Sequence, residues 1–254
     1  MGEPSESAFP STVFVVGGTS GIGRALAGRL RESGRTVIVG GRNRLALEQL
    51  RSEGYHCVDI DVRDAQSVRR ACDEVIRAHP SLGAVITMAG VVIAENIRDE
   101  SHIANLRAML DVNVVGTALV IDAVLPHLLA RGTGRIVTVG SAGAFVPSPR
   151  LPGYAASKAA VHLYTEVLRV QLSGTGIDVV ELIPPPVAVD GSIGAATPDA
   201  MTLEDFVDAA TDALLRTPVE PEIVVDGARE WRYAERDGTY AALLRERVAK
   251  ARLS

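Results

Sequence analysis

The sequence predicts an α/β fold, a doubly wound parallel sheet of about seven strands with helices on both faces. Short β-branched and apolar segments alternate along the chain with longer segments whose apolar residues recur at helical spacing. Connections between these segments are short, and no long hairpin interrupts the alternation. Strands that are apolar on both sides are typical of a parallel sheet covered by helices on both faces.

The first strand, residues 12–16, is a β-branched run that ends in glycines, and residues 22–31 follow with apolar side chains at helical spacing. The same alternation then repeats. Further strands are expected at 36–39, 56–60, 84–88, 135–139, 177–183 and 222–225. Further helices are expected at about 45–51, 65–78, 101–129, 154–172 and 203–215. We find no internal repeat and no visible domain boundary, so a single domain is expected.

Composition excludes several classes of function. The 254 residues are 47% hydrophobic with a net charge of -5, and no lysine and arginine run forms a basic stripe, so nucleic acid is not an expected partner. The N-terminus lacks a signal peptide pattern, and no apolar run is expected to span a membrane. Cys57 and Cys72 show no C-x-x-C spacing, which favours reduced thiols and a cytoplasmic location.

A glycine-rich turn, Gly17-Gly18-Thr19-Ser20-Gly21-Ile22-Gly23, joins the first strand to the first helix. Its spacing is G-x-x-x-G-x-G. Glycines permit close approach of the backbone, and the helix N-terminus offers N–H groups to a pyrophosphate. A turn that only joins strand and helix is the alternative. The expected dinucleotide contacts are Gly17, Thr19, Ser20, Gly21, Ile22 and Gly23.

The next two strands end in residues suited to the adenosine half of a dinucleotide. After the second strand, Gly41 leaves space where an NAD-binding fold has an acidic side chain, and Arg42, beside Asn43, can bind a 2′-phosphate. NADP(H) is therefore expected in preference to NAD(H), unless Arg42 is only a solvated surface residue. Asp61 and Val62 follow the third strand and could contact adenine, although Asp61 could instead cap the next helix.

Tyr154 and Lys158 stand four residues apart, so on a helix they share one face. A nearby ammonium group favours the phenolate and lowers the pKa of tyrosine toward the working range. Ser141 precedes Tyr154 by thirteen residues, and Asn113 lies further upstream. Each of these residues has an ordinary structural alternative, but the set of four predicts proton transfer to a carbonyl oxygen.

These motifs together resemble the classical short-chain dehydrogenase/reductase family over almost the whole chain. The glycine turn is similar to that family's T-G-x-x-x-G-x-G, with Val16 in place of threonine, and residues 154–158 match its Y-x-x-x-K. The resemblance implies a Rossmann-like fold and a catalytic set of Asn113, Ser141, Tyr154 and Lys158. It also implies cofactor contacts from Ala89, Gly90, Pro184 and Val187, and ribose contacts from Tyr154 and Lys158.

In that family the tyrosine donates or accepts the proton, the serine stabilises the developing charge, the lysine holds the ribose and the asparagine supports a water. The expected function is an NADP(H)-dependent oxidoreductase that reduces a ketone or aldehyde, or oxidises the corresponding secondary alcohol. The alternative is a non-catalytic dinucleotide-binding protein of the same fold. Thr87-Met88 replaces the family's paired asparagines and keeps this alternative open. No metal site is expected, because the five histidines show no metal-ligand spacing.

The expected organisation is a disordered tail at residues 1–10, a catalytic domain at 11–227 with a substrate lid at about 189–201, and a helical extension at 228–254. The pocket walls look neutral apart from Arg150, which favours an uncharged or mixed small-molecule substrate. An apolar stripe of Val161, Tyr164 and Leu168 predicts pairing of that helix in a homodimer or homotetramer. The basic extension is expected to be a strut or a subunit contact, or else to bind a membrane surface or an acidic partner.

Overall fold

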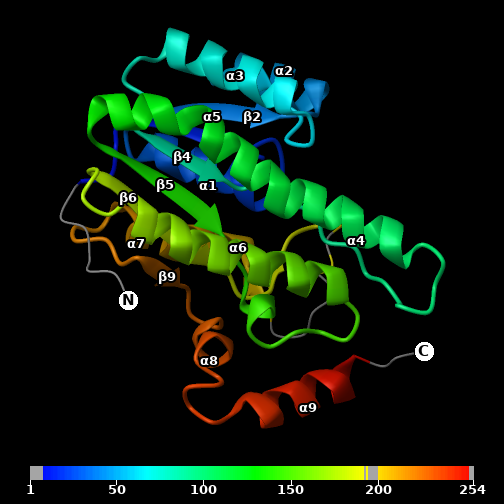
Figure 1. The fold of residues 1–254 in the computed structure, drawn as a ribbon. Helices are drawn as coiled ribbons and strands as arrows, with labels where there is room; N and C mark the ends of the chain where they lie inside the picture. The colour runs from blue at the N-terminus through cyan, green and yellow to red at the C-terminus, as the bar shows by residue number, and fades with distance from the viewer. Residues whose placement is uncertain (1–7, 192, 194–199, 252–254) are drawn as a thin grey trace.

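The computed structural model describes residues 8–191, 193 and 200–251, and confirms the predicted fold class (Figure 1). Seven strands form one sheet in the order β3-β2-β1-β4-β5-β6-β9, and every neighbouring pair is parallel. The strands are β1 (Thr12–Val16), β2 (Thr36–Gly41), β3 (His56–Asp59), β4 (Ala84–Thr87), β5 (Gly134–Val139), β6 (Ile177–Ile183) and β9 (Glu222–Val224). A separate short pair joins β7 (Val187–Ala188) to β8 (Met201–Thr202).

Helices cover both faces of the sheet. They are α1 (Gly21–Glu32), α2 (Arg44–Ser52), α3 (Ala65–Ala78), α4 (His102–Leu110), α5 (Gly116–Arg131), α6 (Pro152–Gln171), α7 (Leu203–Leu215), α8 (Arg229–Arg232) and α9 (Tyr240–Lys250). Buried residues of α1, α2 and α7 form the core on one face, and those of α3, α5 and α6 form the core on the other. Along β1, Val13 and Val15 join the first core while Phe14 and Val16 join the second, as the alternation of side chains in a strand requires.

The long helix expected at 101–129 is α4 and α5 joined through a π-helical turn, η1 (Asp111–Val115), and it stops where Gly132 adopts a left-handed φ of 66°. Within the helix His102–Arg131, an 18-residue window has a mean hydropathy of 1.8, so the helix is long and apolar enough, by length and composition only, to cross a bilayer. One such helix does not contradict the expectation that no apolar run spans a membrane. Core helices of water-soluble proteins pass the same test, and 44% of this window is buried inside the protein.

The N-terminal segment differs in part from the expected tail. Residues 1–7 lie outside the described part of the chain, but Phe9 is 5% exposed and belongs to the core beside β1. The guanidinium carbon of the fully buried Arg135 lies 5.5 Å from the centre of the Phe9 ring. Phe9 therefore packs as a core residue, and a tail could end no later than residue 8. Most of the expected lid at 189–201 also lies outside the described residues.

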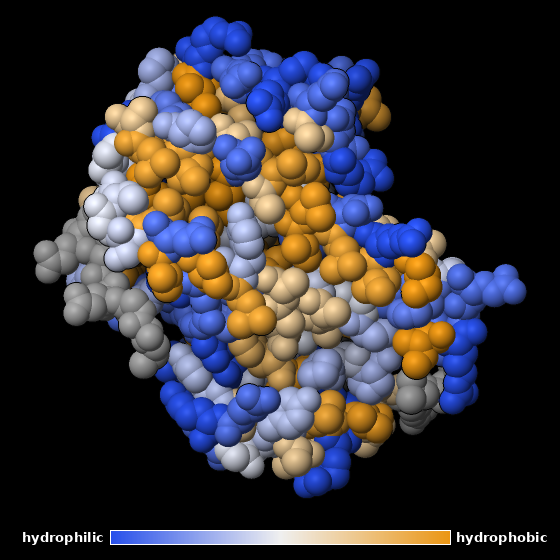
Figure 2. Space-filling model, viewed as in Figure 1, coloured by the Kyte–Doolittle hydropathy of each residue, from blue (hydrophilic) through white to orange (hydrophobic). Residues whose placement is uncertain are grey.

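Two of the three residues expected to form an exposed apolar stripe on α6 are buried. Val161 and Leu168 are 1% and 6% exposed and pack inside the protein, whereas Tyr164 is 38% exposed. The other exposed apolar side chains of this helix are Leu163, Val167 and Val170. Because both faces of α6 carry apolar residues, their spacing alone does not separate the buried face from the exposed one. In Figure 2, apolar side chains gather over the region where α5 and α6 lie side by side in Figure 1.

Candidate active site

A cavity of about 530 Å³ opens at the carboxyl ends of the parallel strands, where ligands of this fold class bind. Most of the residues expected from the sequence line it. They are Gly17, Thr19, Ser20, Gly21, Ile22, Gly23, Arg42, Val62, Ala89, Gly90, Ser141, Tyr154, Lys158, Pro184 and Val187. The glycine turn and the tyrosine–lysine pair, distant in sequence, therefore face one common space.

The glycine turn is packed so closely that side chains are excluded. A Cβ atom on Gly17, whose φ is 92°, would lie 2.4 Å from the backbone nitrogen of Ala89. A Cβ atom on Gly23 would lie 2.2 Å from the carbonyl oxygen of Gly17. Ser20 is the N-cap of α1 and makes no side-chain capping bond. The N–H groups of the first turn of a helix have no partner within the helix, so this end of α1 is suited to bind a phosphate group.

Three residues expected at the site do not line the cavity. The side chain of Asn43 caps α2, accepting a hydrogen bond of 3.1 Å from the Ala46 N–H. Asp61 accepts hydrogen bonds of 2.7 and 3.0 Å from the Arg63 guanidinium, which hold the pKa of this carboxyl near 2. Asn113 is 1% exposed and lies below the cavity floor. The side chains of Asn43 and Asp61 are thus already engaged by protein groups.

Asn113 is held within the π-helical turn η1 and joins two parts of the site. Its amide accepts a 2.8 Å hydrogen bond from the Val91 N–H and donates bonds of 3.0 and 2.9 Å to the Val91 carbonyl and the Ser157 hydroxyl. A Cβ atom added to Gly90 would lie 3.5 Å from Asn113 Oδ1 and 3.8 Å from Lys158 Nζ. Asn113 therefore fixes the loop after β4 against α6, directly beside the lysine.

Ser141, Tyr154 and Lys158 meet at the cavity wall. Ser141 lies two residues after the end of β5, as the N-cap of the short 3-10 helix Ala142–Ala144. Its hydroxyl accepts a 3.1 Å hydrogen bond from the Gly143 N–H. Lys158 Nζ donates a 2.8 Å bond to the Val139 carbonyl and lies 5.8 Å from the centre of the Tyr154 ring. Burial lowers the pKa of Lys158 to about 8, although the charge of Glu181 acts in the opposite direction.

The pKa of Tyr154 shifts in the direction opposite to the one expected. Burial raises it, and the hydrogen bond with Ser141 offsets only part of that effect. The sequence predicted that the lysine charge would lower this pKa, but the removal of the phenol from water has the largest effect on it. The phenol is therefore protonated at neutral pH and can donate a proton to a carbonyl oxygen.

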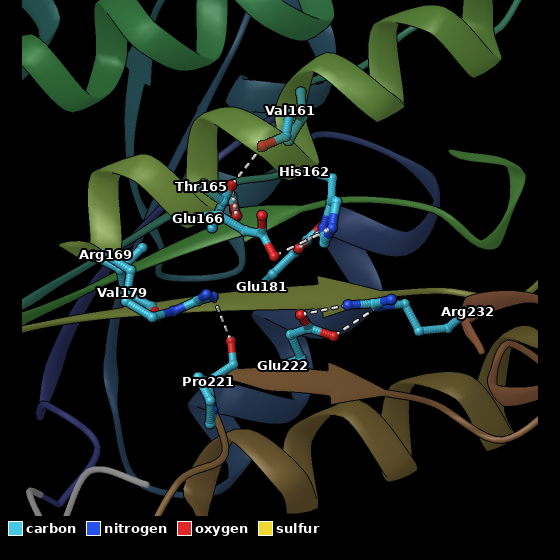
Figure 3. A network of polar contacts seen from close by, with 11 residues as sticks. Val161, His162, Thr165, Glu166, Arg169, Val179, Glu181, Pro221, Glu222 and Arg232 are labelled. Atoms are coloured by element: carbon cyan, nitrogen blue, oxygen red, sulfur yellow. Dashed lines mark hydrogen bonds and ion pairs between the residues drawn. The ribbon is translucent and has the colours of Figure 1, made fainter. Parts of the chain in front are cut away.

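A partly buried network of charged residues joins α6, β6, β9 and α8 (Figure 3). Glu181 of β6 is fully buried and accepts a 2.7 Å hydrogen bond from His162 of α6. On the neighbouring strand Glu222 binds Arg232 through two bonds of 2.8 and 2.9 Å. His162, Glu181 and Glu222 place possible metal ligands within 4.8 Å of one another, but Arg232 already occupies both oxygens of Glu222. Each carboxylate thus has a protein partner of its own.

We expect the Glu181→Gln variant to unfold more easily than the wild type, by about 3 kcal/mol at pH 6. Burial alone lowers the pKa of His162, but hydrogen bonding to Glu181 and its charge raise it overall. A histidine whose pKa is raised on folding stabilises the protein below the unfolded pKa of about 6.5, and this contribution is lost as pH rises through the folded value. The difference between variant and wild type should therefore shrink between pH 6 and pH 8.5 in urea unfolding.

The control for this experiment is Glu166→Gln, because Glu166 is a half-exposed carboxylate 3.6 Å from the other nitrogen of His162. An exposed pair of this kind contributes below about 1 kcal/mol. If the Glu181→Gln deficit were the same at every pH, the proposed ionic pairing of His162 and Glu181 would be incorrect.

Sequence reasoning missed three residues at the site. Glu95 is nearly buried, and its carboxylate accepts a 2.7 Å hydrogen bond from the Gly153 N–H in the first turn of α6, beside Tyr154. Trp231 and Arg247, from the C-terminal extension, line the cavity. No spacing signal pointed to any of them, because each reaches the site only through the tertiary fold.

Comparison with known proteins assigns the family. The sequence profile described as short chain dehydrogenase matches residues 11–197. The chain belongs to the short-chain dehydrogenase family. It is 33% identical over 222 residues to "Sulfoacetaldehyde reductase 2" of Chromohalobacter salexigens, covering 84% of this chain and 85% of that protein. Similarity to such reductases favours an oxidoreductase over the non-catalytic alternative.

Solved structures show the same fold. A short-chain dehydrogenase from Streptomyces avermitilis superposes with a TM-score of 0.81 at 22% identity, covering 95% of this chain and 98% of that one. The 3-ketoacyl-(acyl-carrier-protein) reductase from Brucella melitensis, solved with NADH, gives 0.75 at 24% identity, covering 88% and 99%. These two likenesses show the fold, and the family match together with the reductase relative makes this short-chain dehydrogenase an oxidoreductase.

Proposed function

We propose that this short-chain dehydrogenase is an NADP(H)-dependent reductase of an aldehyde or ketone, or a dehydrogenase of the corresponding alcohol. One observation carries the proposal: Ser141, Tyr154 and Lys158 line the same cavity as the N-terminus of α1. The glycine turn fits a dinucleotide, because no side chain could be added to Gly17 or Gly23 without a backbone clash. The nicotinamide would supply the hydride when bound.

The protein groups would handle the proton and the charge. Tyr154 donates its phenolic proton to the carbonyl oxygen, and the Ser141 hydroxyl donates a hydrogen bond that stabilises the charge developing on the same oxygen. The cationic Lys158 binds ribose hydroxyls and favours the phenolate left after proton transfer. Asn113 holds the segment beside the lysine through its bonds to Val91 and Ser157.

The surroundings of Arg42 and Gly41 support a preference for NADP(H), and the names of the relatives support an aldehyde substrate. Arg42 lines the cavity and is half-exposed, with its guanidinium 3.7 Å from Asp61. A Cβ atom on Gly41 would lie 2.5 Å from the Thr19 methyl group, so Thr19 fills the space that was expected to be open, and an acidic side chain at position 41 would require Thr19 to shift. The relatives named sulfoacetaldehyde reductase act on an aldehyde.

The Arg42→Ala variant should lose NADPH affinity about tenfold while NADH affinity changes little, because a guanidinium that binds a 2′-phosphate has no such partner in NADH. Dissociation constants from fluorescence titration would measure this. Arg44→Ala is the matched control, since Arg44 is largely exposed and pairs with Asp59 at 2.9 Å. Equal losses for both nucleotides in Arg42→Ala would show that the preference is assigned to the wrong residue.

We also propose a cytoplasmic homodimer or homotetramer that pairs through α6. The exposed apolar residues Leu163, Val167 and Val170 of this helix support the proposal. Burial and the charge of Asp122 on α5 raise the pKa of Tyr164, which is also on α6. A second copy of the chain would remove this apolar surface from water. Sedimentation equilibrium of the wild type would report the state of assembly.

A further inference from the structure

The C-terminal extension brings a cationic side chain to the cavity that Ser141 and Tyr154 line. Arg247 of α9 and Trp231 of α8 line the cavity, as do Ser141 and Tyr154. The extension is fixed there because Leu243 of α9 packs in one apolar cluster with Val146, which is fully buried. In Figure 1 the extension runs from β9 through α8 to α9 below the end of α6.

The guanidinium of Arg247 stacks on Trp231 and has no anionic partner in the described part of the chain. Its central carbon lies 3.9 Å from the centre of the Trp231 ring, a stacked position that fixes the plane of the group. Nη1 is buried and has no hydrogen-bond partner among the described residues, and no ion pair joins Arg247 to a described carboxylate. Burial lowers its pKa to about 10, so the group stays charged at neutral pH. A buried charged donor without a partner is costly to a folded protein.

We propose that Arg247 binds an anionic group of the substrate, a carboxylate or a sulfonate borne by the carbonyl compound. The planar fork of arginine matches both groups, Arg247 lines the cavity, and one of its donors has no partner among the described residues. This inference deepens the proposed function and rests on it. It revises the expectation of an uncharged or mixed substrate, which rested on pocket walls that are neutral apart from Arg150; Arg150 is exposed and does not line the cavity, whereas Arg247 does.

The test compares sulfoacetaldehyde, succinate semialdehyde and neutral butanal as substrates of the wild type, Arg247→Met and Arg245→Met. Methionine keeps an unbranched side chain over Trp231, and Arg245 is an exposed arginine on the same helix. In Arg247→Met, kcat/KM for the two anions should fall about 10- to 100-fold, chiefly through KM. Values for butanal, and all values for Arg245→Met, should stay within about twofold. Arg247→Lys should recover part of the loss.

The wild type's kcat/KM for sulfoacetaldehyde, compared with that for succinate semialdehyde, shows whether Arg247 favours a sulfonate or a carboxylate. A wild type that prefers butanal, or an Arg247→Met variant that loses equally on all three substrates, would overturn the inference, since equal loss indicates a packing role for Arg247.

A binding measurement separates this inference from the proposed reaction. Methanesulfonate and acetate are added to the NADPH-loaded protein at constant ionic strength, and the melting temperature is recorded. A rise in melting temperature for the wild type and Arg245→Met that is absent in Arg247→Met supports the anion site. If, in addition, no aldehyde is turned over, only the proposed reaction is refuted, and the anion site stands. Equal rises in all three proteins contradict the site.

Discussion

The Tyr154→Phe variant should lose about a thousandfold in kcat for carbonyl reduction while retaining its affinity for NADPH. A positioned general acid contributes about 10²- to 10⁴-fold to such a reaction. Burial raises the pKa of Tyr154, so at neutral pH the phenol carries the proton that the product alcohol needs. Phenylalanine keeps the ring and its packing but has no proton to donate. NADPH oxidation followed by absorbance, with nucleotide binding measured separately, would provide both values.

Tyr164→Phe is the matched control for that experiment. Tyr164 lies on the same helix, ten residues further on and 38% exposed, and does not line the cavity. Its removal should leave kcat within about twofold. A Tyr154→Phe variant that remains as active as this control would mean that another group transfers the proton.

The second large effect is expected from Gly23→Ala, which should weaken NADPH binding by about 10- to 100-fold. The added Cβ atom would lie 2.2 Å from the Gly17 carbonyl oxygen, and a backbone atom in a tight turn cannot yield cheaply. Overpacking of this kind costs about 1–3 kcal/mol. We expect the turn to shift away from the close approach that a pyrophosphate needs, and isothermal titration would measure the lost affinity.

Gly28→Ala is the internal control, because Gly28 lies on the same helix, α1, and the nearest atom to its added Cβ would be the Tyr55 hydroxyl at 3.8 Å. Alanine is favoured over glycine within a helix by about 0.5–1 kcal/mol. Gly28→Ala should therefore bind NADPH like the wild type and be slightly more stable. If Gly28→Ala lost as much affinity as Gly23→Ala, the effect would reflect the helix in general rather than the glycine turn.

The sheet was predictable because each buried strand is a local apolar run between turn residues. The bounds of β1, β6, α3 and α7 agree with those expected from the sequence. The glycine turn was also a local signal, since its function depends on the absence of side chains at a strand–helix junction. By contrast, the π-helical turn at Asn113 is set by the tertiary hydrogen bonds of that residue, and no sequence period reports them.

The site was predictable only where chemistry and sequence spacing coincide. Tyr154 and Lys158 share a helix face, so the four-residue spacing sufficed. The direction of the Tyr154 pKa shift was not predictable, because it depends on burial by distant segments. Arg247 could not be assigned either, since an arginine-rich helix looks solvated until Trp231 and Val146 are seen to hold it against the cavity.

Transfer of deuterium from labelled cofactor tests the central claim most directly. The protein is incubated with NADPH carrying deuterium at both C4 positions, together with sulfoacetaldehyde, succinate semialdehyde or butanal, and each alcohol is analysed by mass spectrometry. A reductase of the proposed kind yields at least one alcohol with a single deuterium on the former carbonyl carbon, and Tyr154→Phe yields far less. Tight NADPH binding with no deuterium in any alcohol would contradict the account.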